Sequence, residues 1–407
     1  MSEEKPNVPK LRFPGFTDPW EQRKFSEIAT LRRGLTYSPN DITDKNGGVR
    51  VLRSSNISGD QFELHDDDVF VREDAVKIAP AEDGDILITA ANGSSNLVGK
   101  RARICNLPGK TVHGGFMLLA STGDSYYLNA AMGAQWYRRF LHMGVAGGNG
   151  ALGNLDMKAL LDYELLTPSR NERKKIGSLF NRLDSLITLH QRKLDHLKEM
   201  KKGLLQKMFP KNGESIPELR FPGFTDPWEQ RKLGEIAHRI IRKNGGNQSN
   251  LPLTISAQYG LVDQRDYFNN QVASRDMSGY YLLQNGEFAY NKSTSGDSPW
   301  GAVKRLTKYE NGCVSTLYIC FGLDEGDSDF LVTYYETDRW HKEVRMIAAE
   351  GARNHGLLNI APSDFFETEL TMPAEIEEQT QIGAFFQQLD SLITLHQREG
   401  IDQLGQT

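Results

Sequence analysis

Short apolar runs separated by polar turns alternate along this chain with two long stretches of helical periodicity. Val49–Leu52, Asp85–Thr89 and Gly115–Ala120 are apolar runs bounded by turn-forming residues, a pattern that predicts short buried strands. Tyr126–Leu141 has the apolar spacing of a helix, and the glycine-rich stretch Gly144–Gly153 predicts a loop. Short strands mixed with helices favour an α+β fold.

The longest periodic segment, Ile176–Met208, predicts a helix that packs lengthwise on another helix. Its apolar residues follow a heptad spacing, with a second row three residues after the first. A shorter stretch after Pro373 keeps the same phase. His190 and His396 lie on these stripes, where a polar residue can fix the register of a helix pair. The residues expected to pair the helices are Ile176, Leu179, Leu183, Leu186, His190 and Leu197 in the first and Ile382, Phe385, Leu389, Leu392 and His396 in the second.

Two identical segments show that these features belong to a duplicated unit. LRFPGFTDPWEQRK occurs at Leu11–Lys24 and again at Leu219–Lys232, whereas LDSLITLHQR occurs at Leu183–Arg192 and Leu389–Arg398. The offsets of 208 and 206 residues are about half of the 407-residue chain, and such a fixed offset indicates a repeat. The bodies between the repeats have diverged. This combination suggests one scaffold that holds two different binding domains.

Charge is distributed unevenly along the chain. The net charge of −5 argues against a surface that binds nucleic acid all over. Leu166–Glu218, however, has 12 basic and 6 acidic residues. The first body, Phe25–Leu165, is acidic by 3 charges, and the segment Leu219–Glu375, which contains the second body Leu233–Leu370, is acidic by 5. Any contact between the bodies and DNA must therefore come from local basic patches, with acidic faces left for partner proteins or solvent.

Composition and cysteine usage narrow the class of protein. Apolar content of 38% and charged content of 25% are typical of soluble globular proteins. The chain has no apolar run long enough to cross a membrane, and its first residues lack the pattern of a signal peptide. Cys105, Cys313 and Cys320 have neither disulfide-framework nor metal-site spacing. We therefore expect a protein of the reducing cytoplasm with no membrane partner.

The repeated LRFPGFTDPW motifs, the strand motifs GDILIT (from Gly84) and GEFAYN (from Gly286), and the paired helices together resemble the specificity subunits of type I restriction–modification systems. The second helix begins with Glu378-Gln379, as the family pattern does, whereas the first copy departs with Glu172-Arg173. The resemblance covers nearly the whole chain. It implies two α+β target-recognition domains separated by long helices that pair as an antiparallel coiled coil.

The resemblance also implies domain limits along the chain. The expected segments are 11–168 for the first recognition domain with its LRFPGF motif, 169–210 for the central helix, 211–218 for a linker, 219–373 for the second recognition domain with its motif, and 374–407 for a shortened C-terminal helix.

By the same resemblance, each recognition domain reads one half of a bipartite DNA site, while the helices set the gap and dock methyltransferase subunits. The implied partners are double-stranded DNA, two methyltransferase subunits and two motor-nuclease subunits. No cofactor is expected on this chain, because S-adenosylmethionine, ATP and magnesium belong to those partners. The alternative is a coiled-coil scaffold with two protein- or ligand-binding domains and no DNA role, which salt-dependent DNA binding would distinguish.

The polar loops of the two bodies supply the candidate DNA contacts. Base edges are read by Arg, Lys, Asn, Gln, Ser and Thr side chains, whereas phosphate contacts only position the protein. Some of these stretches also suit ordinary polar turns. The candidates are Arg32, Arg33, Tyr37, Arg53, Ser54, Ser55, Asn56, Asn92, Lys100, Arg101 and Arg103 in the first body and Arg239, Arg242, Lys243, Asn291, Lys292, Ser293, Thr294, Lys304, Arg305, Arg353 and Asn354 in the second.

Motifs for catalysis are missing from the sequence. Gly93–Lys100 has the wrong spacing for a phosphate-binding loop. No two prolines are adjacent, which excludes the Asn-Pro-Pro-aromatic motif of adenine methyltransferases. The acidic run Asp66-Asp67-Asp68 is interpreted as a solvated loop, and no metal site is expected. We therefore expect a non-catalytic chain.

Overall fold

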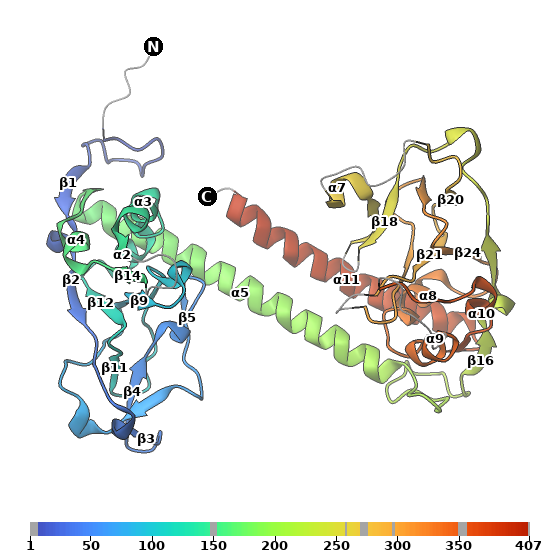
Figure 1. Cartoon of the computed structure of the whole chain (residues 1–407), viewed down its shortest axis with the longest axis horizontal. Helices are drawn as coiled ribbons and strands as arrows, with labels where there is room; N and C mark the ends of the chain where they lie inside the picture. The colour runs from blue at the N-terminus through green and yellow to red at the C-terminus, as the bar shows by residue number, and fades with distance from the viewer. Residues whose placement is uncertain are drawn as a thin grey trace, which may run out of the picture. The chain divides into compact units, whose positions relative to one another are not determined.

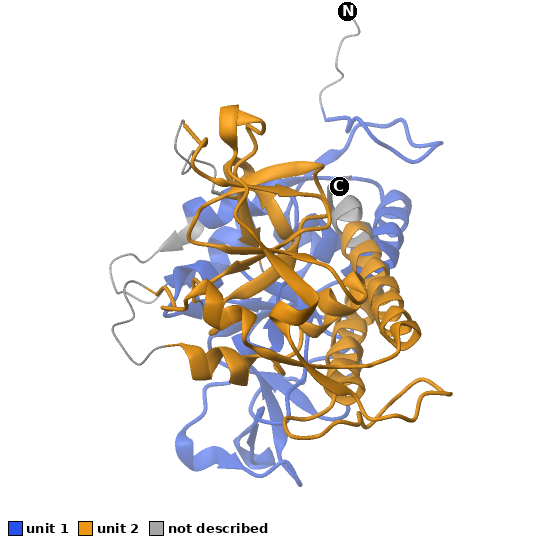
Figure 2. Cartoon of the chain, turned by 90° about the vertical axis from the view of Figure 1, so that its right-hand side faces the viewer, with its two compact units in different colours: residues 1–188 blue, residues 189–407 orange. Residues whose placement is uncertain are grey.

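The computed structural model describes residues 7–146, 153–256, 259–268, 276–294, 298–348 and 356–405. The chain forms two compact units, Met1–Thr188 (unit 1) and Leu189–Thr407 (unit 2), which Figure 2 colours separately. The boundary between them falls inside the longest helix, α5 (Arg170–Met208). Each unit combines strands with helices (Figure 1), which confirms the predicted α+β class. No helix in the described ranges is long and apolar enough to cross a membrane.

Unit 1 contains the strands β1 (Glu21–Lys24), β2 (Thr30–Arg33), β3 (Ile42–Thr43), β4 (Val49–Leu52), β5 (Ile57–Ser58), β6 (Gln61–Phe62), β7 (Val69–Val71), β8 (Ile86–Thr89), β9 (Ala91–Asn92), β10 (Arg101–Arg103), β11 (Thr111–His113), β12 (Met117–Ser121), β13 (Val145–Ala146), β14 (Gly153–Leu155) and β15 (Glu164–Thr167). Its helices are α1 (Phe25–Ile28), α2 (Ser125–Ala131), α3 (Gln135–Gly144), α4 (Met157–Asp162) and the first part of α5.

The central sheet of unit 1 has the order β10-β8-β12-β2, and every neighbouring pair is antiparallel. Side chains alternate between its two faces. Ile86 and Ile88 belong to one buried cluster and Leu87 to another, on the opposite face. Burial on both faces explains why the sequence of β8 is a continuous apolar run rather than an alternating one.

Unit 2 contains the strands β16 (Glu229–Lys232), β17 (Ala237–Ile240), β18 (Leu253–Ser256), β19 (Gly260–Asp263), β20 (Tyr281–Gln284), β21 (Phe288–Asn291), β22 (Ala302–Arg305), β23 (Asn311–Val314), β24 (Ile319–Leu323) and β25 (Glu369–Met372). Its helices are the end of α5, α6 (Leu233–Ile236), α7 (Gln264–Phe268), α8 (Ser328–Tyr334), α9 (His341–Ile347), α10 (Pro362–Phe366) and α11 (Ile376–Gly405).

The central sheet of unit 2, β22-β21-β24-β17, has the same order and antiparallel pairing as that of unit 1. The predicted strands GDILIT and GEFAYN are β8 and β21, which occupy equivalent places in the two sheets. The predicted helix Tyr126–Leu141 is divided into α2 and α3 by a turn at Met132–Ala134. The predicted loop Gly144–Gly153 lies mostly outside the described residues.

The α5 and α11 helices run antiparallel within unit 2. The His190 ring lies 5.8 Å from that of His396, Lys201 binds Asp390, and the Phe209 ring lies 6.3 Å from that of Phe386. As the residue number rises along the first segment, the number of the residue that it contacts in α11 falls. The antiparallel pairing that the family resemblance implied is therefore present in this unit.

The second row of this helix pair differs from the prediction by one residue. Ile382, Leu389 and His396 are buried as expected, but the row between them consists of Phe386 and Ile393, while Leu392 is 47% exposed. A seam of this kind alternates steps of four and three residues. The heptad prediction placed the second row three residues after the first, where a step of four was needed.

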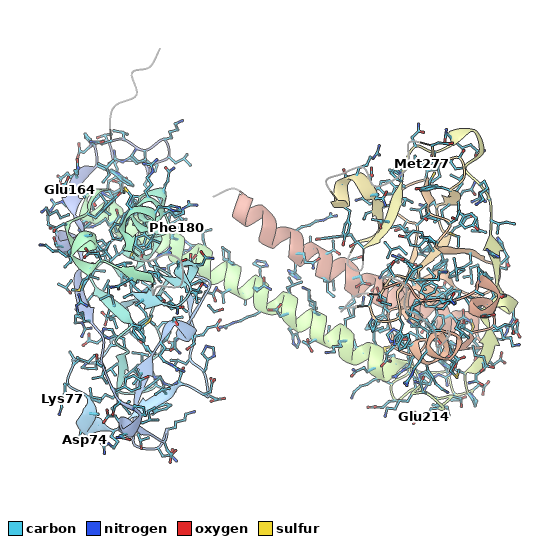
Figure 3. The ribbon with its side chains drawn as sticks, viewed as in Figure 1. Asp74, Lys77, Glu164, Phe180, Glu214 and Met277 are labelled. Atoms are coloured by element: carbon cyan, nitrogen blue, oxygen red, sulfur yellow. The ribbon has the colours of Figure 1, made fainter. Side chains whose placement is uncertain are left out.

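The same alternation of four- and three-residue steps places Lys201 on the seam of α5. The seam residues there are His190, Leu194, Leu197, Lys201, Leu204 and Met208. Leu197 is buried as predicted, whereas Leu179 and Leu186 are exposed. Phe180, labelled in Figure 3, is exposed as well. Ile176 and Leu183 are half-buried.

Each LRFPGF motif is fastened to the helix that follows its body. Arg12 donates to both carboxylate oxygens of Glu172 at 2.8 and 2.9 Å, and Arg220 donates to those of Glu378 at 2.6 and 2.8 Å. Both glutamates are buried in the first turns of α5 and α11. Two-point pairing of guanidinium with carboxylate fixes geometry as well as distance. The motif therefore holds the start of the helix against its own unit.

Antiparallel strand pairing completes this junction. β1 pairs with β15, and β16 pairs with β25, in the same register. The helix then crosses a short helix of the body at a glycine. A side-chain carbon on Gly177 would lie 2.7 Å from the backbone nitrogen of Tyr127, and one on Gly383 would lie 2.6 Å from that of Phe330. Only glycine permits these approaches.

We expect Arg220→Ala to lower the stability of unit 2. The substitution leaves the buried carboxylate of Glu378 without its cation, and breaking such a pair costs about 3 kcal/mol. Urea unfolding of the full chain should shift to a lower midpoint. Lys232→Ala is the matched control, because its 2.7 Å pair with Glu367 is exposed and should contribute little. Equal shifts in the two variants would show that the buried pair is not the fastening.

We expect the Lys201 ammonium group to make a pH-dependent contribution to the free energy of unfolding. It lies 2.6 Å from Glu336 and also binds Asp390. Burial lowers the pKa of Lys201, but the two carboxylates together raise it above its ordinary value, while burial and Glu336 raise the pKa of Asp390. A raised lysine pKa means that folding favours the charged form, so its contribution is present at neutral pH and is lost only above the ordinary lysine pKa.

Lys201→Met should therefore destabilise the protein by about 2 kcal/mol at pH 7, below the value for a fully buried pair because Asp390 is half-exposed. This loss of stability should shrink as the pH falls, because the pKa of Asp390 is raised and this carboxyl group no longer needs a cation once it takes up a proton. Unfolding free energies of both proteins at several pH values measure this difference. A difference independent of pH would exclude the charge argument.

Candidate nucleic-acid interface

The polar loop RSSN (Arg53–Asn56) of unit 1 is held in place by a buried ion pair. Arg50 on β4 forms an ion pair with Asp68, and Asp68 also accepts from the Asn56 side chain at 2.8 Å. The Asn56 side chain in turn accepts from the backbone N–H of Arg53 at 2.8 Å. These bonds fix the four residues between β4 and β5 and leave Arg53 and Ser55 exposed.

A groove of about 610 Å³ lies beside this loop. Its polar lining includes Tyr37, Arg53, Ser54 and Asn92, four of the residues predicted to contact DNA. The Asn92 side chain donates to the Ser54 hydroxyl at 3.3 Å, which joins the two polar stretches. The structure therefore brings together residues that lie up to 55 positions apart in the sequence.

The turn before β12 also lines the groove, and a glycine contact sets its position. A side-chain carbon on Gly34 would lie 1.9 Å from the carbonyl oxygen of Gly114. The backbone N–H of Leu35 also donates to the carbonyl of His113 at 2.7 Å. The segment that carries Tyr37 and the turn that carries Phe116 are thus in direct backbone contact. Phe116 also lines the groove and is 65% exposed.

Several predicted DNA contacts in unit 1 have partners within the fold. Asn56 has no exposed surface, so its predicted role is corrected to that of a loop support. Arg101 is buried and donates to the carbonyl of Asn129 at 3.2 Å, and it lies 3.4 Å from Asp60. Arg103 lies over the Tyr126 ring, and Arg32 pairs with Asp85 at 2.9 Å. Contact between DNA and these three arginines stays a prediction, as it does for exposed Arg33 and half-buried Lys100.

Unit 2 shows a similar division between engaged and exposed cations. Arg242 pairs with Glu287 at 2.7 Å, Lys243 lies over the Tyr281 ring, and Arg305 binds Asp329. Arg239 is exposed on β17. The predicted contacts Arg353 and Asn354 lie outside the described residues.

The predicted loop Asn291–Thr294 is fixed to a distant segment of unit 2. Thr294 donates to the carbonyl of Gly356 through its backbone N–H at 2.7 Å and its hydroxyl at 2.9 Å. The Lys292 ammonium donates to the carbonyl of Ile360 at 3.2 Å, and burial lowers its pKa. Asn291 accepts from the backbone N–H of Ser293 at 3.0 Å. The loop is thus ordered before any ligand binds, and Ser293 is exposed on it.

A second groove of about 530 Å³ lies along α5 in unit 2. Its lining includes Lys198, Lys202 and Lys304 together with Glu336 and Asp338. Lys304 is one of the predicted DNA contacts, whereas the lysines of α5 were not singled out. Their place on a helix face gave no signal in the sequence beyond the net positive charge of that region.

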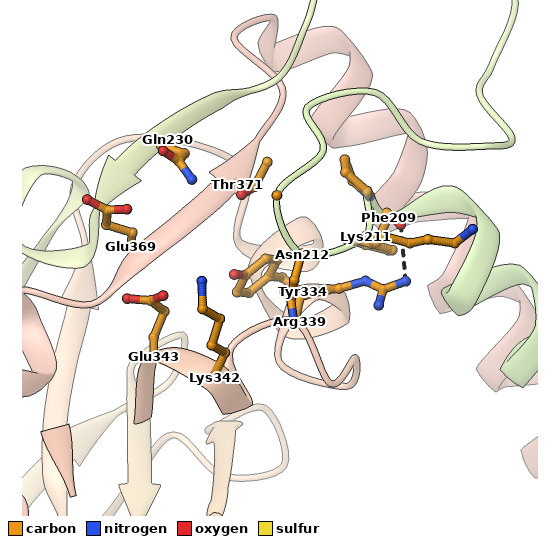
Figure 4. Close-up of a pocket in the computed structure, with 12 residues that line it drawn as sticks. Phe209, Lys211, Asn212, Gln230, Tyr334, Arg339, Lys342, Glu343, Glu369 and Thr371 are labelled. Atoms are coloured by element: carbon orange, nitrogen blue, oxygen red, sulfur yellow. Dashed lines mark hydrogen bonds between the residues drawn. The ribbon is translucent and has the colours of Figure 1, made fainter. Parts of the chain in front are cut away.

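A small hollow of about 40 Å³ marks the end of α5 (Figure 4). Arg339 donates to the carbonyls of Gln206 at 2.9 Å and Phe209 at 3.3 Å. The last carbonyls of a helix have no partner within the helix, and this guanidinium supplies one. The hollow is therefore a helix-capping junction and too small for a ligand.

The acidic run of unit 1 corrects one interpretation of the sequence. Asp66 is fully exposed, as a solvated loop requires, but Asp68 is 6% exposed and belongs to the Arg50 pair. No group of three or more metal-ligating side chains occurs among the residues that the structure describes.

Comparison with known proteins gives similarities in both sequence and fold. Over 240 residues, the chain is 24% identical to a protein of Methanocaldococcus jannaschii named "Putative type I restriction enzyme MjaX specificity subunit". The aligned part is 56% of this chain and 55% of the relative, so the chain spans about half the length of the curated relative that it matches. No protein-family model matches the chain.

Among solved structures, the Type-I restriction-modification system S subunit from M. genitalium matches with a TM-score of 0.57 at 12% identity, covering 98% of this chain and 96% of the other. The HsdS subunit from Thermoanaerobacter tengcongensis matches with a TM-score of 0.40 at 14% identity, covering 96% and 93%. This chain therefore has the fold of the M. genitalium S subunit.

We expect Asp68→Ala to destabilise unit 1 and to loosen the RSSN loop. The substitution leaves Arg50 buried without its carboxylate, at a cost of about 3 kcal/mol. Faster amide hydrogen exchange at Arg53–Asn56 and a lower urea midpoint would report the two effects. Asp66→Ala, two residues away and fully exposed, is the control and should change neither quantity. If both variants behave alike, the buried pair does not support the loop.

Proposed function

We propose that this chain is the non-catalytic DNA-specificity subunit of a type I restriction–modification complex. Each unit reads one half of a bipartite site in double-stranded DNA. The α5 and α11 helices set the distance between the halves and dock two methyltransferase subunits. Two motor-nuclease subunits complete the complex, in the cytoplasm. S-adenosylmethionine, ATP and magnesium are bound by these partners and not by this chain.

One observation carries the proposal, namely that the two units share their frame but differ in their loops. The sheet order, the pairing of the LRFPGF motif with its helix, and the glycine crossing occur in both units. The polar loops do not repeat, since RSSN beside the groove of unit 1 has no identical counterpart in unit 2. A protein that reads two different half-sites needs one frame and two sets of side chains.

The similarity to type I specificity subunits in sequence and fold supports the same conclusion. The predicted segment limits, 11–168, 169–210, 211–218, 219–373 and 374–407, are part of this proposal. A scaffold with two protein-binding domains would explain the helices equally well. It would not require polar side chains such as Arg53, Ser54 and Asn92 to converge on one groove.

Exchanging the body Phe25–Leu165 for that of another such subunit should change one half-site and leave the other half and the gap unaltered. The reason is that the exchanged segment carries the loops, whereas the helices and unit 2 stay the same. Mapping methylated adenines in DNA modified by the assembled complex measures all three quantities. The parent chain is the control. A change in both halves, or an absence of sequence-specific methylation by the parent complex, would contradict the proposed function.

A further inference from the structure

Both units expose a large apolar side chain at the same place in the fold. Phe116 is 65% exposed and Leu317 is 58% exposed. Each is the third residue of a four-residue turn that leads into the strand between the two neighbours β8 and β2, or β21 and β17. Single exposed apolar residues are common on protein surfaces. Their recurrence at one position of two diverged bodies is not explained by that background.

The two turns have the same hydrogen-bonding pattern. The backbone N–H of Met117 donates to the carbonyl of Gly114 at 2.8 Å, and that of Tyr318 donates to the carbonyl of Ser315 at 3.1 Å. In unit 1 the carbonyl of Phe116 also accepts from the N–H groups of Ala90 and Ala91, at 2.9 and 3.0 Å. The backbone is therefore fixed while the side chain is left outside the core.

Polar donors line the same groove as Phe116. Arg53, Ser54 and Asn92 line the same groove of about 610 Å³, and Gly93 and Gly114 supply no side chain that could cover the ring. Phe116 is 65% exposed in a groove whose lining combines these polar side chains with apolar ones such as Ile42 and Met117, so it contributes little to the buried core. Its retention there is explained by a ligand with an apolar feature next to hydrogen-bonding groups.

We propose that Phe116 in unit 1, and Leu317 at the equivalent position in unit 2, contact the 5-methyl group of a thymine in the half-site that each unit reads. In the major groove this methyl group is the apolar feature of the base edges, next to acceptors that Arg, Ser and Asn recognise. The inference rests on the proposed function and names residues that determine its specificity.

The test compares thymine with uracil, which differ only in that methyl group. The full chain assembled with its methyltransferase subunits is bound to duplexes in which each thymine of the mapped site is replaced in turn. With the wild-type chain, at least one replacement in each half-site should weaken binding about fourfold, because that is the value of burying one methyl group. Phe116→Ala should abolish this preference in one half-site and leave the other half-site unchanged, whereas Leu317→Ala should do the reverse.

Two controls separate contact from other effects. Phe116→Leu should keep part of the preference, because leucine occupies the equivalent position in unit 2. Leu11→Ala removes an exposed leucine outside the groove and should change nothing. A half-site without A·T pairs, a wild-type chain that binds thymine and uracil equally, or a Phe116→Ala chain that keeps the preference would each overturn the inference. A wild-type complex without any sequence-specific binding would instead refute the proposed function itself.

Discussion

The fold depends on one buried contact that occurs twice, the two-point ion pair between the arginine of each LRFPGF motif and a glutamate at the start of the following helix. Because both charges are withdrawn from water, neither residue can leave the other without a large loss of free energy. The contact joins segments 160 and 158 residues apart, so it closes each body into a loop whose two ends are fixed side by side. The helix then leaves every body from the same place, and the residues between the two ends are free to vary.

The residue after each of these glutamates differs between the two units, yet it binds an equivalent partner in both. Arg173 follows Glu172 and lies 2.9 Å from a carboxylate oxygen of Asp124, whereas Gln379 follows Glu378 and accepts from the backbone N–H of Asp327 at 2.9 Å. Both partners precede the short helix that the long helix crosses at a glycine. An ion pair in one unit thus replaces a neutral hydrogen bond in the other, and the same two elements stay in contact.

The sequence predicted the duplication, the α+β class and the central strands, because these depend on repeats and on local periodicity, whereas the antiparallel pairing of the helices was implied by the family resemblance. It missed what depends on distant partners. In the sequence, Asp68 is indistinguishable from its solvated neighbours, but in the structure it pairs with Arg50. Lys201 likewise has the sequence context of a surface lysine, but it pairs with Glu336 and Asp390. Four predicted DNA contacts converge on one groove, but Phe116 was missed, because the apolar run Gly115–Ala120 predicted a buried strand whereas Phe116 lies exposed in the turn before β12.

These observations separate the interactions that stabilise the protein from those that are available for recognition. Many of the basic side chains on the bodies are already paired, for example Arg32 with Asp85, Arg242 with Glu287 and Arg305 with Asp329. Under the proposed function, a body with a net negative charge and many paired cations attracts DNA only weakly in a sequence-independent way. Affinity for a half-site then comes from contacts to base edges. A reader of this kind discriminates strongly between sequences because little of its binding energy is shared by all of them.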